Sequence, residues 1–426
     1  MQRTRVILGR FLRQSDPKQL SFDPKSALLM EGETIAARLT PEEAQTLARQ
    51  GVPVEDFGEA LVIPGLNDLH THAPQYAFRG TGMDLELLDW LEKYTFPEEG
   101  RYAEEAYARK AYGLFVEELK NGPTTRACIF ATTHVPATLR LMDLLEESGL
   151  STLVGKVSMD RDCPDHIREE TGEALGAVRE WLERSRGYQR TRPILTPRFI
   201  PSCTDPLLEG LGRLQKETGL PVQSHLSENP GEIELVKSLC PWAQSYGHAY
   251  DRFGLFGGEG CPTVMAHCVH SAPEEVDLMA ERGVFVAHCP QSNANLASGI
   301  APVRAYLDRG IPVGLGTDVA GGHSLSMFRA VTDAVQVSKL RWRLTDSSLA
   351  PLTFPEALWL ATRGGGTFFG KVGALEPGYA ADLLVLDDSG LPAPRELSPE
   401  ERLERIFYLG DDRNVRSKYV AGRKMK

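Results

Sequence analysis

The chain of 426 residues carries 47 Lys and Arg against 58 Asp and Glu, which gives a formal net charge of −11. This acidic balance argues against a nucleic-acid-binding surface as the main function. A composition of 42% hydrophobic and 25% charged residues is typical of a globular protein with a large core, and it excludes the disordered, collagen-like and coiled-coil classes.

Both ends of the chain have a strand-and-turn texture. We predict a helix at 41–50 and short strands at 5–12, 26–30, within 372–386, and at 415–424. Because chain termini in a domain often lie close together, we expect these strands to pair into one small module made of residues 1–63 and 372–426. The alternative is that each terminus forms an independent tail.

Between these ends, short apolar runs alternate with longer helix-like segments such as 204–218 and 273–282. The runs are at 60–63 leading into His70, 125–131, 152–159, 193–199, 221–225, 263–267, 284–288 and 312–318. This alternation is typical of parallel βα units. Eight units in sequence favour an α/β fold with a closed (β/α)8 barrel, which we place at 64–371.

Several histidines fall at the predicted carboxyl ends of these strands, where such a barrel places its active site. His70 and His72 form an H-x-H pair, which alone is a weak motif, but alternate residues of an extended segment point to one face. The fifth strand ends at His225, the sixth at His267 and the eighth at Asp318. Singly, each histidine is better explained as a hydrogen-bonded core or loop residue; jointly they predict a metal site.

Three neutral imidazoles and a carboxylate suit Zn²⁺ and leave one position open for water. Such an ion lowers the pKa of its water to about 7, which makes hydroxide available at physiological pH. The alternative for Asp318, a turn-capping carboxylate, does not explain why the histidines converge.

Glu228 follows His225 by three residues and precedes a helix start. Asn229 fits the N-cap, Pro230 the first helical position and Glu232 a capping box. Glu228 is thereby placed outside the helix at the barrel mouth, where it can shuttle protons if its pKa is raised. The alternative is a solvated glutamate.

The seven cysteines are odd in number and scattered from Cys128 to Cys289, which indicates a reducing compartment and not a disulfide framework. The first ten residues contain an apolar run too short for a signal peptide, and no uncharged stretch approaches the roughly 20 residues of a membrane helix. We therefore expect a cytoplasmic protein that does not contact membranes.

Nine blocks of sequence, in order, resemble the amidohydrolase superfamily of metal-dependent hydrolases, and within it the members that deaminate guanine. They are PGLNDLHTHAPQ (64–75), LLDWLEKYTFP (87–97), VGKVSMD (154–160), TPRFIPSC (196–203), QSHLSEN (223–229), VMAH (264–267), AHCPQSN (287–293), GLGTDVAGG (314–322) and YLGDDRN (408–414). The resemblance implies zinc-dependent hydrolysis of guanine to xanthine and ammonia. It also implies a homodimer whose barrel carries a β-sandwich built from both chain ends.

The resemblance also assigns residues. The metal ligands correspond to His70, His72, His225 and Asp318, of which His225 and Asp318 also touch the substrate. His267 corresponds to a histidine that hydrogen-bonds the metal-bound water, and the remaining substrate contacts are Gln75, Arg198, Phe199 and Glu228. His270, in His-Cys-Val-His, departs from the pattern, and we interpret it as a loop residue at the rim of the pocket.

The residue at the end of the fourth predicted strand indicates how many metal ions the site holds. Binuclear relatives of such barrels carry a carboxylated lysine at the end of strand four, where this chain has Arg198. Arginine cannot take that role because it stays protonated. Lys156 lies on the third predicted strand, and we interpret it as a packing or ion-pair residue. We therefore expect one ion per subunit, with zinc favoured and iron left open.

A mechanism follows for guanine, whose amine sits on C2 between two ring nitrogens. As a hypothesis, Glu228 protonates N3 while Asp318, aided by His267, takes the proton of the water that attacks C2. Arg198 offers only donors, which suit the O6 and N7 acceptors of guanine and mismatch the amine of adenine. Gln75 can read another edge of the base, and Phe199 is as well explained by the core as by the pocket.

Trp90, Tyr94 and Phe96 follow the first predicted strand beside leucines 85, 88 and 91 at helical spacing. This stripe reads mainly as the buried face of a helix, from which one aromatic ring could cover the purine. His288 ends the seventh strand, and we interpret it as a hydrogen-bonding residue and not as a ligand.

Two other functions stay open. The same chemistry could act on another base, such as 8-oxoguanine, a pterin, a cytosine-like base or a triazine. Alternatively, the chain could be a non-catalytic interaction protein with an amidohydrolase-like fold, although such a protein would be expected to have lost metal ligands.

Overall fold

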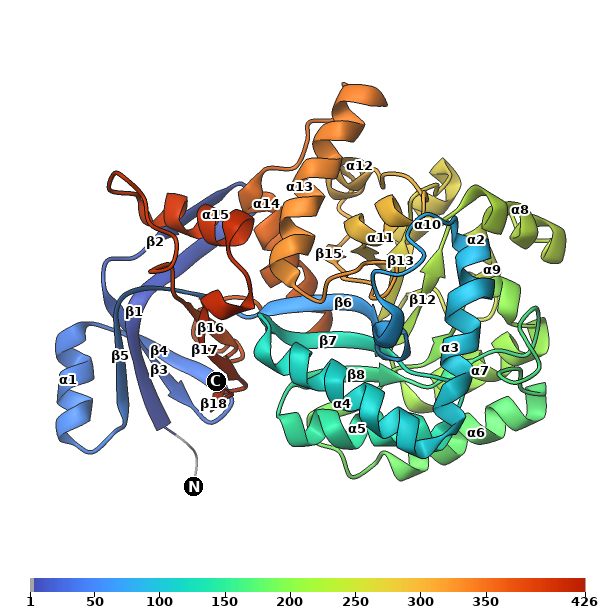
Figure 1. Ribbon diagram of the computed structural model, residues 1–426, viewed down its shortest axis with the longest axis horizontal. Coiled ribbons are helices and arrows are strands. Elements are labelled where there is room, and N and C mark those ends of the chain that lie inside the picture. Colours follow the sequence, from blue (N-terminus) through green and yellow to red (C-terminus); the bar gives the residue numbers. More distant parts are fainter. Residues whose placement is uncertain (1–3, 426) are drawn as a thin grey trace.

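Both ends of the chain contribute strands to one sheet in the computed structural model, which describes residues 4–425 (Figure 1). The order is β18-β17-β16-β5-β1-β3-β4, with β2 paired to β1. These strands are β1 (Thr4–Asp16), β2 (Gln19–Phe22), β3 (Ser26–Glu31), β4 (Thr34–Leu39), β5 (Val54–Pro64), β16 (Leu383–Leu386), β17 (Val415–Val420) and β18 (Arg423–Lys424). The predicted terminal strands are therefore confirmed.

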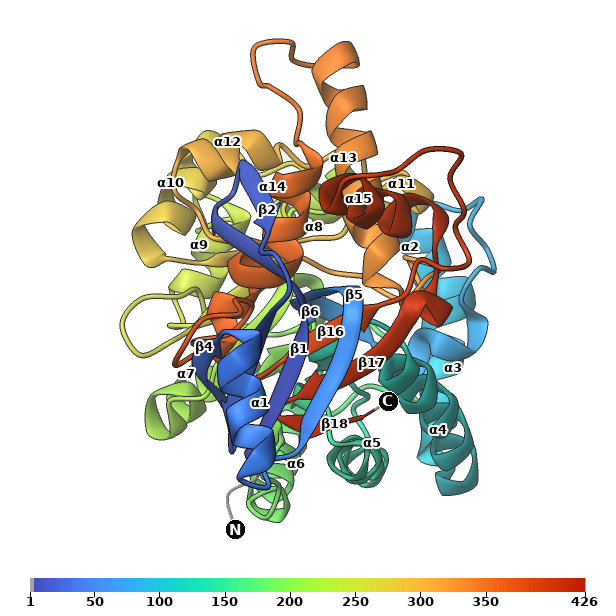
Figure 2. The ribbon, with the colours of Figure 1, turned by 90° about the vertical axis from the view of Figure 1, so that its left-hand side faces the viewer.

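The two ends meet where β5 pairs antiparallel with β16, with Val62 opposite Val385. In Figure 2 the blue β5 and the red β16 lie side by side, with helix α1 (Pro41–Arg49) in front of the sheet. The alternative of independent tails is therefore wrong, because strands from the first 64 residues and the last 44 share one hydrogen-bonded sheet.

The prediction from sequence assigned one strand to the wrong sheet. The apolar run at 60–63 belongs to β5, whereas the first strand of the second sheet is β6 (Leu66–His72). The run is apolar without alternation because both of its faces are covered. Leu61 and Ile63 pack into the large core, and Val62 packs into the separate core of the terminal sheet.

The second sheet is entirely parallel and has the order β10-β8-β7-β6-β15-β14-β13-β12. The strands not yet named are β7 (Thr124–Phe130), β8 (Ser151–Gly155), β10 (Thr191–Pro193), β12 (Val222–Leu226), β13 (Thr263–His267), β14 (Phe285–His288) and β15 (Val313–Leu315). Two short strands, β9 (Val157–Ser158) and β11 (Thr196–Pro197), pair with each other. An isolated parallel bridge joins Leu195, just after β10, to Val222 of β12, at the other end of the order.

Helices follow the strands of this parallel sheet and surround it (Figure 1). They are α2 (Leu87–Trp90), α3 (Phe96–Gly100), α4 (Glu105–Asn121), α5 (Val135–Ser148), α6 (Thr171–Arg184), α7 (Asp205–Thr218), α8 (Pro230–Leu239), α9 (Tyr246–Asp251), α10 (Pro273–Arg282), α11 (Pro290–Asn295), α12 (Val303–Asp308), α13 (Met327–Leu344) and α14 (Phe354–Trp359). A further helix, α15 (Pro399–Leu409), lies between β16 and β17 of the terminal sheet in the sequence. The helices expected at 41–50, 204–218 and 273–282 are confirmed. Within the described residues, no helix has both the length and the apolar character needed to cross a membrane.

Local sequence explains the bounds of α7. The side chain of Thr204 accepts a hydrogen bond from the backbone N–H of Leu207, which caps the helix start. The helix ends at Gly219, whose φ of 64° lies in the left-handed region that glycine adopts most easily. The helix buries Leu207, Leu208, Leu211 and Leu214 in the large core. Strands β6 and β7 of the parallel sheet are buried along their whole length.

Lys156, between β8 and β9, lies wholly in the interior. Its Nζ is 2.5 and 2.6 Å from the two carboxylate oxygens of Glu169, which confirms the ion-pair interpretation. Burial lowers the pKa of Lys156, and the charge of Glu169 opposes that shift. The pair fastens the 159–171 connection to the sheet.

Replacing Lys156 with alanine is expected to lower the free energy of unfolding by about 3 kcal/mol, because Glu169 would keep a largely buried charge without its partner. Urea denaturation of the two proteins measures this difference. Lys110→Ala, on the exposed face of α4, is the matched control and should change the free energy by less than about 0.5 kcal/mol. A Lys156→Ala loss as small as the control's would contradict the structural role of the pair.

Candidate functional site

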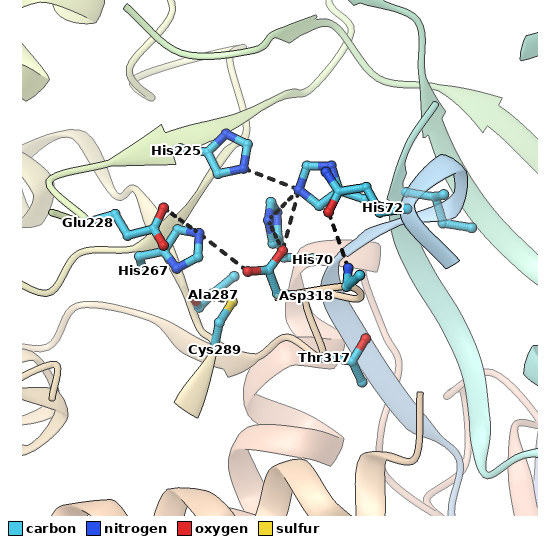
Figure 3. Close-up of polar contacts among 12 residues, drawn as sticks. His70, His72, His225, Glu228, His267, Ala287, Cys289, Thr317 and Asp318 are labelled. Atoms are coloured by element: carbon cyan, nitrogen blue, oxygen red, sulfur yellow. Dashed lines mark hydrogen bonds and ion pairs between the residues drawn. The ribbon is translucent and has the colours of Figure 1, made fainter. Parts of the chain in front are cut away.

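Four of the five candidate side chains reach the site from the carboxyl ends of parallel strands, and the fifth follows one (Figure 3). His70 and His72 come from β6, His225 from β12 and His267 from β13. Asp318 lies three residues beyond β15. Although up to 248 residues separate them in sequence, the strand order brings them to one edge of the sheet, and each is at most 5% exposed except His225, which is half-buried.

The imidazole nitrogens converge on one point. The Nε2 atom of His72 is 3.2 Å from Nε2 of His70 and 3.2 Å from Nε2 of His225. Oδ1 of Asp318 is 3.1 Å from Nε2 of His70 and 3.4 Å from that of His72. Ligand atoms at roughly 2.0–2.1 Å from one tetrahedral ion lie about 3.3 Å apart, so these four residues have the spacing of a single first coordination shell.

The charge states also suit a cation. Burial, and then the neighbouring His70, lower the pKa of His72 and of His225 well below the usual range, so both rings are neutral and carry a lone pair. Burial alone would raise the pKa of Asp318, but the adjacent histidines lower it, so this carboxyl is ionised. A site with neutral imidazoles and one carboxylate is a set of donors that Zn²⁺ prefers.

Two hydrogen bonds fix which nitrogen of each ring faces the site. Nδ1 of His225 donates to the backbone carbonyl of Arg198 at 2.7 Å. Nδ1 of His267 donates to Oδ1 of Asn293 at 2.8 Å. In both rings Nε2 is thereby left as the acceptor that points into the site. Asn293 was not singled out from the sequence, although it ends the AHCPQSN block.

Asp68 supports the ligands from behind. Its Oδ1 accepts from the backbone N–H groups of His70 at 3.1 Å and Thr317 at 3.0 Å, and its Oδ2 accepts from the Thr317 hydroxyl at 2.5 Å. Burial raises the pKa of Asp68 to about 6, against the effect of these hydrogen bonds. One carboxylate thus ties the segment of the H-x-H pair to that of Asp318, 249 residues away.

The backbone is strained at two of the site residues. His267 has a φ of 72° and Asp318 a φ of 47°, values that non-glycine residues seldom adopt. Asp318 is held there by its N–H, which donates to the carbonyl of His70 at 2.8 Å. The turn after each strand therefore directs a polar side chain back over the end of the sheet.

Glu228 lies beside this cluster. The capping box predicted for the next helix is present, with Asn229 as the N-cap and Glu232 as its partner. Glu228 is only 3% exposed, so the solvated alternative is wrong. Its Oε2 is 3.3 Å from Nε2 of His267, and its Oε1 accepts from the Ser298 hydroxyl at 3.1 Å. Burial and then the charge of Asp318 raise its pKa well above the usual range, which favours the protonated acid.

A small pocket opens over the cluster and collects the other candidates. Gln75, Arg198 and Phe199 line it together with Glu228, His267 and Asp318. Trp90 also lines it, beside Leu87, Leu91 and Leu296. The interpretation of this segment as the buried face of one helix is only partly confirmed. Leu88 is 41% exposed, and a π turn at Leu91–Thr95 interrupts the helix.

Three residues lie at the edge of the site. Arg198, predicted to contact the substrate, forms an ion pair with buried Glu99. His270 donates from Nε2 to the carbonyl of Ser298 at 2.7 Å and so lies in a loop, as expected. The interpretation of His288 as a hydrogen-bonding ring is wrong at Nδ1, which is buried without a partner among the described residues. Burial and the nearby His267 lower its pKa to about 3.

Comparison with known proteins places the chain among hydrolases. The model of the amidohydrolase family matches residues 61–425. A guanine deaminase of Dictyostelium discoideum is 41% identical over 88% of this chain and 84% of its own length. A guanine deaminase of Escherichia coli is 33% identical over 87% of this chain and 84% of its own. The crystal structure of a guanine deaminase from C. acetobutylicum with bound guanine is 43% identical, covers 99% of both chains and superposes with a TM-score of 0.94.

Proposed function

The chain belongs to the amidohydrolase family, and on that premise we propose that it deaminates guanine to xanthine and ammonia with one Zn²⁺ per subunit. It is a metal-dependent aminohydrolase, and the similarity to guanine deaminases supports the substrate predicted from its sequence. The observation that carries the proposal is the pocket itself. Its lining combines Gln75 and Arg198, which can donate hydrogen bonds to a purine, with Glu228 and members of the histidine cluster.

His70, His72, His225 and Asp318 would hold the ion, because their donor atoms have the spacing and charge of one zinc shell. When bound, the ion would acidify a water molecule and make it a nucleophile near neutral pH. A single ion is favoured because Arg198, and not a lysine, follows the fourth strand of the sheet. Iron remains an alternative for the same donors.

Glu228 is the proposed acid. Its raised pKa keeps a proton on the carboxyl, which can pass to N3 of guanine and make C2 a better electrophile. Asp318 is ionised and accepts the proton of the attacking water. Nε2 of His267 lies 3.7 Å from Oδ2 of Asp318 and orients that water. Proton return from these carboxyl groups to the C2 amine allows ammonia to leave.

Arg198 and Gln75 are the proposed readers of the base. Arg198 offers N–H donors to O6 and N7 of guanine, and Gln75 offers both a donor and an acceptor to a second edge. Trp90 is the aromatic residue that would cover the ring, since it lines the pocket. Phe199, at 7% exposure, contributes to both the pocket and the core.

We extend the proposal to the architecture. Residues 64–371 would form a closed (β/α)8 barrel, a reading supported by the bridge between Leu195 and Val222. Residues 1–63 and 372–426 would form the β-sandwich module, supported by the pairing of β5 with β16. We also propose a cytoplasmic homodimer: the family resemblance supports the dimer, and the seven free cysteines support a reducing compartment.

Purified protein is expected to release ammonia fastest from guanine and to contain about one zinc per chain. The assay compares guanine with 8-oxoguanine, a pterin, cytosine and a triazine, and metal content is measured by elemental analysis. Faster turnover of another base would replace guanine as the substrate. Protein with no metal and no turnover would instead favour a non-catalytic interaction role.

A further inference from the structure

Glu99, on helix α3, connects the two residues proposed to read the base. Its Oε1 accepts from Nε2 of Gln75 at 3.1 Å, and its Oε2 accepts from Nη1 of Arg198 at 2.5 Å. The carboxylate is 2% exposed and does not line the pocket, so it lies behind both readers. We propose that Glu99 is a positioning residue that sets purine specificity by fixing the donor pattern of Gln75 and Arg198; this inference rests on the proposed function.

The amide of Gln75 has one permitted orientation in this arrangement. Its Oε1 accepts from the backbone N–H of Ala320 at 3.2 Å, while its Nε2 donates to Glu99. A flipped amide would place its nitrogen against the N–H of Ala320 and its oxygen against a carboxylate. Glu99 therefore determines which side of Gln75 carries the donor that is left for the base.

Arg198 is held by two contacts from the same short helix. Glu99 pairs with Nη1, and the guanidinium carbon lies 5.3 Å from the centre of the Phe96 ring, three residues earlier. The side chain of Arg198 is 3% exposed, so its charge needs a buried counterion. With one nitrogen and one face occupied, the remaining N–H groups are free to donate to the base.

The carboxylate is the one side chain that suits both partners at once. It accepts at two oxygens and has no donor, so each partner must present an N–H to it. The glutamine of Glu99→Gln has nearly the same shape but only one oxygen, so its amide nitrogen would face a donor of Gln75 or Arg198. One reader would then turn away, and the buried arginine would lose its counterion.

The test uses two bases that share the C2 amine. Guanine carries O6 and a proton on N1, whereas 2-aminopurine has hydrogen at C6 and no proton on N1. For Glu99→Gln we expect kcat/KM for guanine to fall about a hundredfold, and that for 2-aminopurine less than threefold, because 2-aminopurine keeps N7 but has no O6 to accept from Arg198 and no N1 proton for Gln75 to recognise. Glu98→Gln is the matched control, since Glu98 is adjacent, also pairs with an arginine, and does not line the pocket.

A purely structural role would lower turnover of both bases equally and would overturn the proposal, as would wild-type kinetics on guanine. If Glu99→Gln does not fold, Glu99→Asp carries the test: it keeps the charge, cannot reach both partners and should show the same selective loss on guanine. Failure of both variants to fold would overturn the proposal by showing that Glu99 serves the fold. Absence of guanine turnover in the wild type would instead defeat the proposed function, independently of any Glu99 variant.

Discussion

Replacing Glu228 with glutamine is expected to lower kcat for guanine by about a thousandfold while the metal content stays at the wild-type value. Glutamine has nearly the same size and can still bond to Ser298, so the fold and the histidine cluster should persist. It cannot deliver a proton to N3, and C2 of the unprotonated aromatic base is a poor electrophile. Steady-state kinetics with guanine and elemental analysis of the same sample measure both quantities.

The sign of the pH dependence follows from the same residue. Burial and the Asp318 charge raise the pKa of Glu228, so the required acid is present at low pH and is lost as the pH rises through that raised value. Glu234→Gln, on the exposed side of α8, is the control and should retain wild-type kcat. Full turnover by Glu228→Gln would remove Glu228 from the mechanism.

The positions of the strands could be predicted because their information is local. Runs such as 263–267 and 284–288 are apolar and short, and each is followed by a helix that begins at a proline, α10 at Pro273 and α11 at Pro290. The run at 60–63 was assigned to the wrong sheet, because burial on both faces removes the alternation of polar and apolar residues that helps to assign a strand. Periodicity reports that a residue is covered, and it does not report which sheet covers it.

The groups that meet directly at strand ends could be predicted for the same reason. Parallel strands all end at one edge, so His70, His225 and His267 had to lie close together once the strand order was assumed. Asp68 and Glu99 could not be found in this way, because their partners lie 249 and 99 residues away and are set by loop packing. A buried carboxylate just before a ligand pair was the only local signal for Asp68.

Removing the metal is expected to abolish turnover, and restoring Zn²⁺ is expected to recover it. Without a cation, Nε2 of His72 lies 3.2 Å from Nε2 of both His70 and His225 with no ion between them, and no metal charge balances Asp318. Dialysis against a chelator should therefore lower ammonia release to background and also lower the thermal midpoint, since a ligand present at a thousand times its Kd contributes about 4 kcal/mol. Calorimetry and the ammonia assay, before and after zinc is added back, measure these effects.

A pair of histidine variants separates loss of the ion from general damage. His225→Ala removes one predicted ligand and should bind little zinc and turn over no guanine. His248→Ala should keep both, because His248 lies on α9, outside the pocket, where its Nδ1 accepts from the backbone N–H of Gln244. A His225→Ala protein with full zinc content would exclude His225 from the coordination shell, and chelated protein with undiminished turnover would exclude the metal from the reaction. The predicted ligands lie at or just beyond strand ends. Either result would therefore show that the convergence of these residues at one edge of the sheet does not by itself make the reaction depend on a metal.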